Sequence, residues 1–428
     1  MPIRPVIVVG AGLAGLTATL QLARRGVPVT LLDGSGRLGG RARSTGPDGF
    51  TLNLGPHGML MGGPGAAVLK QLGIALPGGP PAYRRARLLV DGRIVGPLDR
   101  RHGGGGLRTL AGVGRLARDA RRGDPDGSVA DWLARRLPDA RARGTATVLA
   151  RLLTYADSPD TQAADVMAEA LRAGAVRYLD GGWGALVGRL DTATRAAGAE
   201  VRTGSGVAAV RRDADHWRVE LRTGDVLEAA AVILAAGGPA DVAGLLDGPA
   251  HDVAAGWARR ATPVHMACLD VALARRPAGP AGVFGVDEPL YLSVQSDASD
   301  LAPAGGAVVQ VARFLPVGGT APDGTRGRLE ALLDQALPGW RAHVVQARYL
   351  PDLTVTHDGC LVSAGGRRAR PGPEVPGAPG LYVAGDWVGT RGTLSQASIA
   401  SASTAASAVA TSLAGRAGRT DPHREQVA

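Results

Sequence analysis

Three glycines, Gly10, Gly12 and Gly15, stand at the spacing of a dinucleotide-binding turn. The run 10–15 reads G-A-G-L-A-G and lies between an apolar, β-branched segment at 6–9 and a segment with helical apolar spacing. In such a turn the first glycine permits the bend, the second lets a pyrophosphate approach the backbone, and the third lets helix and strand pack closely. Asp33 lies 18 residues after Gly15, where a carboxylate accepts hydrogen bonds from ribose hydroxyls. The pattern predicts a bound dinucleotide without a 2′-phosphate.

A second glycine pair, Gly39-Gly40, precedes Arg41 and would place a fixed positive charge beside the pyrophosphate. The stretch 37–41, R-L-G-G-R, resembles the R-x-G-G-R motif of the superfamily of flavin-dependent amine oxidases and phytoene desaturases, which also includes protoporphyrinogen oxidase. The resemblance implies that the dinucleotide is FAD.

Further segments resemble flavin contacts of the same superfamily, in the same order. They are 54–57, 204–210 with Val207 against the adenine, 234–237, and 383–386 followed by a helix starting near Leu394. The Asp386 carboxylate would bind a ribitol hydroxyl, and the positive end of that helix would face the flavin N1 and C2 carbonyl and stabilise the anionic reduced ring. The resemblance implies FAD contacts at Gly10, Gly12, Leu13, Ala14, Gly15, Asp33, Gly34, Arg37, Gly39, Gly40, Arg41, Gly55, Pro56, His57, Val207, Ala236, Gly385, Asp386, Thr393, Leu394 and Ser395.

The expected reaction depends on groups that this chain lacks. The superfamily's amine oxidases place two aromatic rings before the flavin, whereas the matching positions here are Leu361 and Leu394. They also use a lysine near flavin N5, and the only lysine here, Lys70, lies in another region. We therefore expect a desaturase or dehydrogenase that moves a hydride from a C–H bond of a mostly apolar small molecule to flavin N5. Oxygen or another acceptor would reoxidise the flavin.

Three other functions stay open. The first is amine or amino-acid oxidation without the lysine, and the second is a flavin-dependent isomerase or cyclase with no net redox change. The third is a binding protein that lost the flavin, as Rab-escort-type relatives did. The Gly39-Gly40-Arg41 motif and Asp386 argue against this last function.

Some side chains have both a chemical and a structural interpretation. His57 would lie near the isoalloxazine ring, where it could accept a proton as the C–H bond breaks, or it could fix its loop by hydrogen bonds. His265 and His357 are weaker catalytic candidates. Cys360 lies where some relatives attach the flavin, but a free cysteine is more often a small buried hydrophobe, so we expect non-covalent FAD. Trp183, Tyr291 and Phe314 are expected to pack, and the last two could instead line a substrate site.

The elements that position these residues predict an α/β fold. Strands at 6–9, 29–32, 200–202, 231–235 and 380–386 are typical of a Rossmann-type, glutathione-reductase-like FAD-binding domain. The stretches between them are helix-rich or mixed, which indicates an inserted α+β substrate domain. We predict an FAD-binding domain from 1–65, 181–250 and 346–415, a substrate domain from 66–180 and 251–345, and a flexible tail at 416–428. Residues 103–106 are predicted to be a mobile loop.

Composition excludes several classes of protein. The 428 residues are 45% hydrophobic and 20% charged, as in a globular chain. The net charge of +10 comes from scattered arginines without interleaved aromatic residues, which argues against nucleic acid. Two cysteines exclude a disulfide framework and a CxxC zinc site, so we expect no metal and a cytoplasmic location. The basic balance allows peripheral contact with an anionic membrane; the oligomeric state is not predicted.

Overall fold

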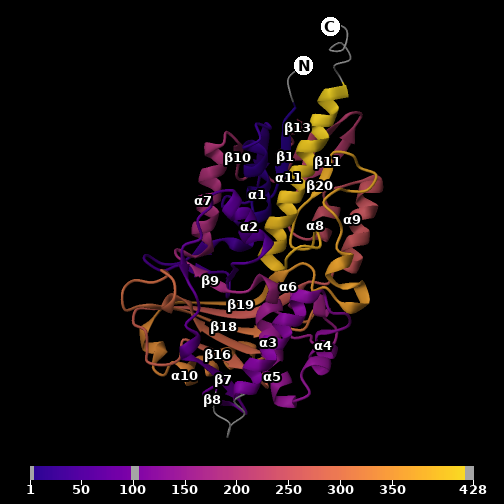
Figure 1. Cartoon of the computed structure of the whole chain (residues 1–428). Coiled ribbons are helices and arrows are strands. Elements are labelled where there is room, and N and C mark those ends of the chain that lie inside the picture. Colours follow the sequence, from indigo (N-terminus) through magenta and orange to yellow (C-terminus); the bar gives the residue numbers. More distant parts are fainter. Residues whose placement is uncertain (1–3, 98–105, 420–428) are drawn as a thin grey trace.

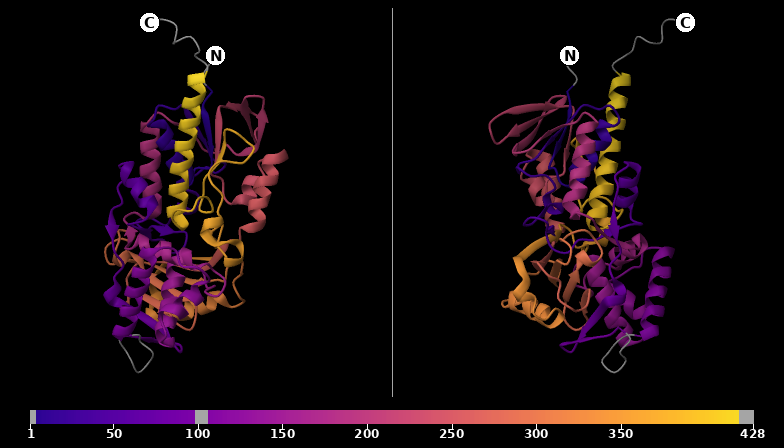
Figure 2. Two further views of the ribbon diagram at one scale, coloured as in Figure 1. Left: turned by 45° about the vertical axis from the view of Figure 1, so that its right-hand side comes forward. Right: turned by 90° about the vertical axis from the view of Figure 1, so that its left-hand side faces the viewer.

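The chain forms two parts, each built on one large sheet and stacked one above the other (Figure 1). The computed structural model describes the backbone of residues 4–97 and 106–419 and the side chains of 4–97 and 111–415. The upper part holds both ends of the described chain, and the lower part joins it through several crossings (Figure 2).

A five-stranded parallel sheet organises the upper part. Its strand order is β10 (Glu200–Arg202), β2 (Val29–Leu32), β1 (Val6–Val9), β14 (Ala231–Leu234) and β20 (Leu381–Val383). Strands β1, β2 and β14 are buried throughout, as continuous apolar runs in a covered parallel sheet should be. Because the strands are parallel, the carboxyl ends of β1, β14 and β20 meet at one edge.

Different elements cover the two faces of this sheet. On one face lie α1 (Leu13–Ala23), α7 (Gly182–Ala196) and α11 (Leu394–Arg419), and α2 (Pro64–Gln71) packs beside α11. The other face carries the antiparallel strands β11 (Val207–Asp213), β12 (His216–Leu221) and β13 (Val226–Ala229) with helices α8 (Pro239–Ala243) and α9 (Gly248–Arg260). The sheet edge, left free by these layers, faces the lower part.

The lower part is built on a seven-stranded mixed sheet. Its order is β19 (Val344–Thr356), β15 (Val264–Leu273), β18 (Ala307–Phe314), β17 (Leu290–Val294), β16 (Gly282–Gly285), β7 (Ala86–Val90) and β8 (Arg93–Val95). Helix α10 (Thr325–Ala336) covers the apolar face formed by residues such as Leu269 and Val311. The alternate residues of the same strands, among them Met266 and Phe314, form a separate apolar cluster on the opposite face.

Four helices pack beside this sheet around their own core: α3 (Gly106–Arg122), α4 (Val129–Arg136), α5 (Ala140–Thr154) and α6 (Ala164–Ala173). Ser128 and Asp131 form the capping box that starts α4. Short strands connect the parts: β3 (Ser44–Thr45), β4 (Leu52–Asn53), β5 (Met59–Leu60), β6 (Gly78–Gly79) and β9 (Val176–Leu179).

Several predicted boundaries differ from the structure. Helices α2 and α9 pack with the upper part, although 66–71 and 251–260 were assigned to the substrate domain, so the predicted boundaries cut through both helices. Residues 346–356 were assigned to the FAD-binding domain, but they belong to β19 of the lower sheet. This strand is at the sheet edge and partly exposed, so it lacks the continuous apolar run that identified the inner strands. The predicted tail begins too early, because α11 continues to Arg419. Residues 420–428 and the predicted loop at 103–105 lie outside the described residues, and Gly106 begins α3.

No helix in the described part of the chain is long and apolar enough to cross a membrane.

Candidate functional site

A cavity of about 1260 Å³ lies at the carboxyl edge of the parallel sheet, between the two parts. Pockets for drug-sized ligands measure roughly 300–1,000 Å³, so this cavity has room for a dinucleotide and a further small molecule. The predicted residues that line it are Gly10, Gly12, Leu13, Ala14, Asp33, Gly34, Gly39, Gly40, Arg41, Pro56, His57, Val207, Ala236, Gly385, Asp386, Leu394 and Ser395. The fold therefore brings together residues from all the predicted motifs.

The glycine-rich turn forms a narrow slot at the end of β1. Gly10 has φ +99°, and a methyl group on it would lie 2.6 Å from the Ala235 carbonyl oxygen. A methyl group on Gly12 would instead meet no described atom closer than 4.0 Å, and one on Gly40 would lie 3.7 Å from the Gly12 Cα. Gly12 and Gly40 thus lie next to each other and both line the cavity with bare backbone, as a backbone cradle for pyrophosphate requires.

Asp33 connects this turn to the end of β2. Its carboxylate accepts hydrogen bonds from the Ala11 N–H at 2.6 Å and from the Ser35 N–H at 2.7 Å, and it also lines the cavity. Each carboxylate oxygen has two lone pairs, so acceptor capacity remains for ribose hydroxyls. Asp33 both fixes the turn and remains available to a ligand.

Four predicted contacts lie outside the cavity lining. A methyl group on Gly15 would lie 1.8 Å from the Gly10 carbonyl oxygen, so this glycine serves the packing of α1 on β1. Arg37 is exposed. Gly55 is buried against Leu353. The hydroxyl of Thr393 is buried and has no hydrogen-bond partner among the described residues.

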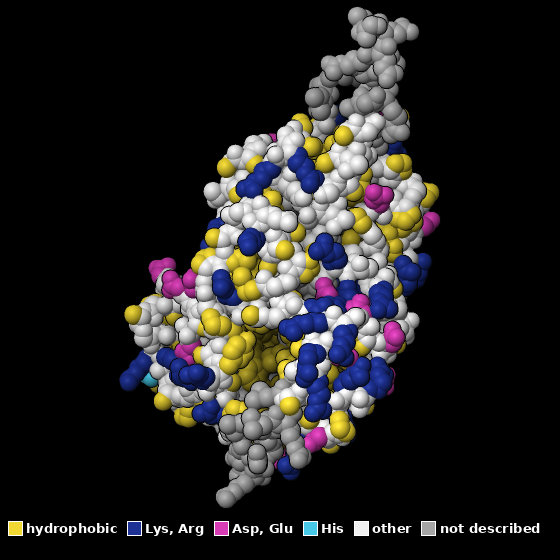
Figure 3. All heavy atoms as spheres, in the orientation of Figure 1, with side chains coloured by type: hydrophobic (Ala, Val, Ile, Leu, Met, Phe, Trp, Pro, Cys, Tyr) yellow, Lys and Arg dark blue, Asp and Glu magenta, His cyan; other side chains and the backbone are white. Residues whose placement is uncertain are grey.

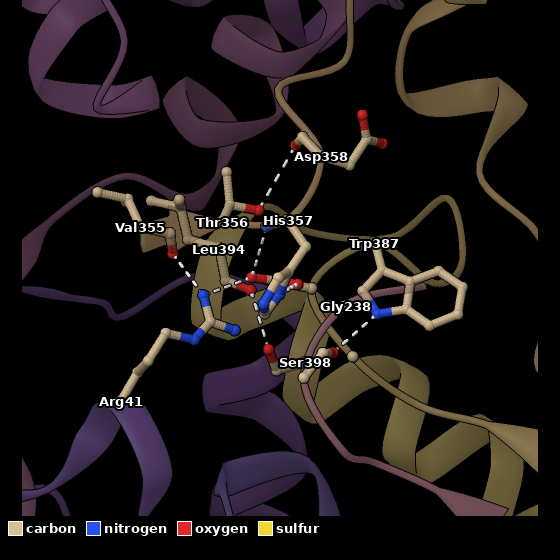
Figure 4. A network of polar contacts seen from close by, with 12 residues as sticks. Arg41, Gly238, Val355, Thr356, His357, Asp358, Trp387, Leu394 and Ser398 are labelled. Carbon is tan, nitrogen blue, oxygen red and sulfur yellow. Dashed lines mark hydrogen bonds and ion pairs between the residues drawn. The ribbon is translucent and has the colours of Figure 1, made fainter. Parts of the chain in front are cut away.

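Asp386 is the most strongly held acid of the site, and the two side chains that bind it, Arg41 and His357, are labelled in Figure 4. It is 1% exposed and forms an ion pair with the Arg41 Nη1 at 2.8 Å and a hydrogen bond with the His357 Nδ1 at 3.0 Å. Burial alone would raise the pKa of Asp386, but the charge of Arg41 and the His357 ring outweigh it and hold that pKa well below its usual range. The carboxylate is therefore an ionised acceptor at the cavity wall.

Helix α11 begins at the same wall. The turn before it is fixed by Gly392, with φ +77°, whose N–H donates to the Glu169 Oε1 at 2.7 Å. Arg370 holds the Gly392 carbonyl from the other side, at 3.4 Å. The first N–H groups of a helix have no intrahelical acceptor, and Leu394 and Ser395 line the cavity. This helix end can therefore bind an electron-rich group such as the flavin N1 and C2 carbonyl edge.

A row of polar side chains on the lower sheet supports the loop 54–57. In register across β19, β15 and β18 lie Arg348, Asp270 and Gln310. The Gly55 N–H donates to the Asp270 Oδ2 at 3.2 Å, and the Gln310 Nε2 donates to the Gly55 carbonyl at 2.8 Å. Arg348 pairs with Asp270 at 2.7 Å. Asp270 and Gln310 are fully buried and Arg348 is partly buried, so the loop is tied to the lower sheet by a polar network that the sequence did not reveal.

The position of Gly55 determines the orientation and the protonated nitrogen of the His57 ring. The His57 Nδ1 lies 3.1 Å from the Gly55 carbonyl oxygen, which only accepts, so Nδ1 carries the proton and Nε2 is left with a lone pair. The ring packs edge-on against Trp183, with centroids 5.0 Å apart. Burial lowers the pKa of His57, and the charge of Arg41 lowers it further. A neutral imidazole whose Nε2 keeps a lone pair thus belongs to the cavity wall, while its Nδ1 performs the loop-fixing role.

The remaining wall, on the lower part, is mostly apolar. It is formed by Leu54, Tyr155, Met266, Leu353 and Val355, with Trp183 from the start of α7. Of the two positions compared with an aromatic pair, Leu394 lines the cavity and Leu361 does not. Tyr291 and Phe314 are buried behind this wall, and His265 also lies outside the lining.

Several lining residues were missed or undervalued by sequence reasoning. They are Arg43, Tyr155, Trp183, Arg222, Asp241, Met266, Leu353 and His357. Arg43 lies two residues after the R-L-G-G-R stretch, and this proximity was an available signal. Tyr155 had no such signal in the sequence, because its place in the cavity wall depends on a backbone φ of +58° at the end of α5.

Cys360 lies near the predicted attachment region, but it is buried, with 1% of its surface exposed, and it does not line the cavity. Burial raises the pKa of its thiol, which disfavours the thiolate needed for attachment to a flavin. We therefore expect acid precipitation of the purified protein to release all of its flavin into the supernatant. Absorbance at 450 nm measures the released fraction, and flavin retained in the pellet would contradict this expectation.

Asp270 makes a second prediction, about stability. Burial raises the pKa of Asp270 to about 6, despite its Arg348 partner. A raised carboxyl pKa favours the folded state below the unfolded value of 3.8, and this advantage is lost as the pH rises through 6. Between pH 4 and 7, the free energy of unfolding should thus fall in wild type by on the order of 3 kcal/mol more than it does in Asp270→Asn. Urea titrations at each pH measure the free energy of unfolding, and Asp323→Asn, at an exposed position, serves as the control. A difference between wild type and Asp270→Asn that does not change with pH would contradict the prediction.

Comparisons with known proteins agree with this geometry. A family model described as flavin containing amine oxidoreductase matches residues 13–263, more than half of the chain. A hydroxyneurosporene desaturase of Rubrivivax gelatinosus is 51% identical over 51 residues, which are 12% of this chain and 10% of that protein. An L-amino-acid oxidase of Pseudechis australis is 53% identical over 53 residues, again 12% and 10%. The chain spans about a tenth of the length of these curated relatives.

Among solved structures, an oxidoreductase from Methanosarcina mazei has the same fold, with a TM-score of 0.71 and 19% identity over 95% of this chain and 100% of that one. The slot between Gly12 and Gly40, the ionised Asp386 and the open end of α11 fit FAD. The chain belongs to the flavin containing amine oxidoreductase family and has a mixed α/β fold.

Proposed function

We propose that the protein removes a hydride from a C–H bond of a mostly apolar small molecule and leaves a C=C or C=N bond. The observation that carries this proposal is the apolar wall of Leu54, Tyr155, Met266, Leu353 and Val355 on the lower side of the cavity. No acidic or lysine side chain belongs to this wall among the described residues, so nothing there would pair with a charged ammonium group. Figure 3 shows a hollow on one face of the molecule whose inside is likewise apolar.

In this proposal the upper part is a Rossmann-type, glutathione-reductase-like FAD-binding domain and the lower part is the substrate domain. The slot at Gly12 and Gly40, with Arg41, holds the pyrophosphate, and Asp33 and Val207 hold the adenosine. Asp386 would accept a hydrogen bond from a ribitol hydroxyl, and the start of α11 would bind the N1 and C2 carbonyl edge of the flavin ring. When bound, the flavin supplies the two-electron acceptor that a departing hydride needs.

The chain's own residues would do the rest of the chemistry. The apolar wall desolvates the substrate and holds its C–H bond against the cofactor. His57 offers a neutral acceptor nitrogen for the proton that leaves with the new double bond. Oxygen or another acceptor then removes the two electrons. A positive helix end beside the ring would favour the reduced, anionic form.

The test is an anaerobic absorption titration of the purified holoprotein with amines, amino acids, and polyene or porphyrinogen-like compounds. Bleaching of the flavin band by the apolar compounds only is the expected result. Bleaching by an amine or amino acid would replace the proposal with amine oxidation. Conversion of an apolar compound without net reduction of the flavin or any acceptor would indicate an isomerase or cyclase.

A further inference from the structure

The end of strand β19 brings a histidine to the centre of the cofactor site. Strand β19 ends at Thr356, which pairs with Val264, and His357 is the next residue. It is thereby carried from the lower sheet to the carboxyl edge of the upper sheet, where it lines the cavity and contacts Asp386. Its side chain is labelled in Figure 4. Sequence reasoning gave His357 only as a weak catalytic candidate, because the direction of its side chain was unknown.

The contacts between His357 and Asp386 involve both carboxylate oxygens. The ring Nδ1 lies 3.0 Å from Oδ1, and the backbone N–H of His357 donates to Oδ2 at 3.3 Å. Arg41 pairs with Oδ2 at 2.8 Å and also donates to the Val355 carbonyl. Two donors from one residue fix the plane of the carboxylate, and the arginine adds the opposite charge.

The backbone beneath the histidine is shaped to hold the ring. A methyl group on Gly238 would lie 2.6 Å from the His357 Cδ2. The Gly238 N–H is itself held by the Asp241 carboxylate at 2.7 Å. The imidazole therefore lies against bare backbone on one side and bonds to Asp386 through Nδ1.

We propose that His357 is a cofactor-positioning residue, which keeps the Asp386 carboxylate ionised and oriented toward the FAD. An ionised carboxylate that is 1% exposed needs hydrogen-bond partners, and it must also lie near the dianionic pyrophosphate. Arg41 is the group expected to serve the pyrophosphate, so it is shared between two anions. His357 has no second anion in the described contacts, and it holds both oxygens of Asp386 whether or not Arg41 turns away.

This role makes a prediction about the ring itself. Because the ionised Asp386 only accepts hydrogen bonds, the Nδ1 of His357 must carry the proton. Nitrogen NMR of histidine-labelled wild-type protein, assigned by loss of the signal in His357→Asn, should show the Nδ1–H form with and without FAD. The Nε2–H form would overturn the proposal without depending on any variant's stability.

The functional test uses FAD itself, titrated into deflavinated protein and followed by flavin fluorescence. His357→Leu removes the side-chain donor and should weaken FAD binding by at least about tenfold. His357→Asn keeps an N–H donor near the position of Nδ1 and should remain within about threefold of wild type. In an Asp386→Asn background, His357→Leu should weaken FAD binding by less than about a further twofold, because the effect of His357 on FAD binding depends on Asp386.

Circular dichroism and the melting temperature of each deflavinated variant separate this role from a general loss of fold. His265→Asn serves as a control for a histidine outside the cavity. Wild-type FAD affinity in His357→Leu would overturn the proposal, as would an undiminished effect in the Asp386→Asn background. A His357→Asn variant as weak as His357→Leu would also overturn it. None of these outcomes depends on the substrate, so the inference stands or fails separately from the proposed reaction.

Discussion

Replacing Gly12 by alanine should leave the FAD-free protein folded and weaken FAD binding by about 100-fold. The backbone of Gly12 has φ −76°, which alanine adopts without strain, and its new methyl group would meet no described atom within 4.0 Å. The same methyl group would project into the slot opposite Gly40, where the pyrophosphate must approach the backbone. The variant thus tests whether the absence of a side chain at Gly12 is needed for FAD binding and not for folding.

Gly15→Ala gives the contrasting result. Its methyl group would overlap the Gly10 carbonyl oxygen at 1.8 Å, so α1 could not pack on β1 and the FAD-free protein itself should be destabilised by several kcal/mol. Gly36→Ala is the matched control, since Gly36 is exposed and no described atom lies within 4 Å of the added methyl group.

Melting temperatures of the three FAD-free variants, and FAD titrations of those that fold, measure these effects. If Gly12→Ala binds FAD like wild type, the pyrophosphate does not lie against the backbone of Gly12. If Gly12→Ala melts as early as Gly15→Ala, the slot serves the fold instead of the ligand.

The glycine motif illustrates what a sequence can predict. Gly10, Gly12 and Gly15 belong to one strand–turn–helix unit, so their spacing alone predicted the turn, and the contact of Gly15 with the Gly10 carbonyl lies within that unit. The packing of Gly10 against Ala235 joins the turn to a distant strand and had no local signal. The inner strands β1 and β14 were equally clear, because burial on both faces requires continuous apolar runs.

The rest of the site depends on contacts between distant segments. His357 approaches Asp386 only because β19, a partly exposed edge strand, ends at the upper sheet. The support of Gly55 by Asp270 and Gln310 requires the register of β15 against β18, which no local pattern encodes. Long-range pairing of this kind is set by tertiary packing, so the apolar wall and the polar contacts that support the cavity residues could not be predicted.

His57 is the remaining question of mechanism, and its two nitrogens allow its two interpretations to be separated. The Nδ1–H bond to Gly55 fixes the loop, whereas Nε2 is the nitrogen available to a substrate proton. Asparagine at this position keeps an N–H donor near Nδ1 and removes the acceptor nitrogen. His57→Asn should therefore retain FAD affinity within about threefold, while loss of a general base lowers the rate of flavin reduction by at least about 100-fold.

The pH dependence gives an independent test of the same role. The neutral ring accepts the proton, and burial together with Arg41 lowers the pKa of His57 from its usual 6.5. The rate of anaerobic flavin reduction in wild type should then stay constant as the pH falls from 8 to 6.5, and decrease only at lower pH. Stopped-flow measurements use the compound that bleaches the flavin, with His265→Asn as control. Equal reduction rates in His57→Asn and wild type would restrict His57 to holding its loop, and the proton would then have to leave to water or to the substrate itself.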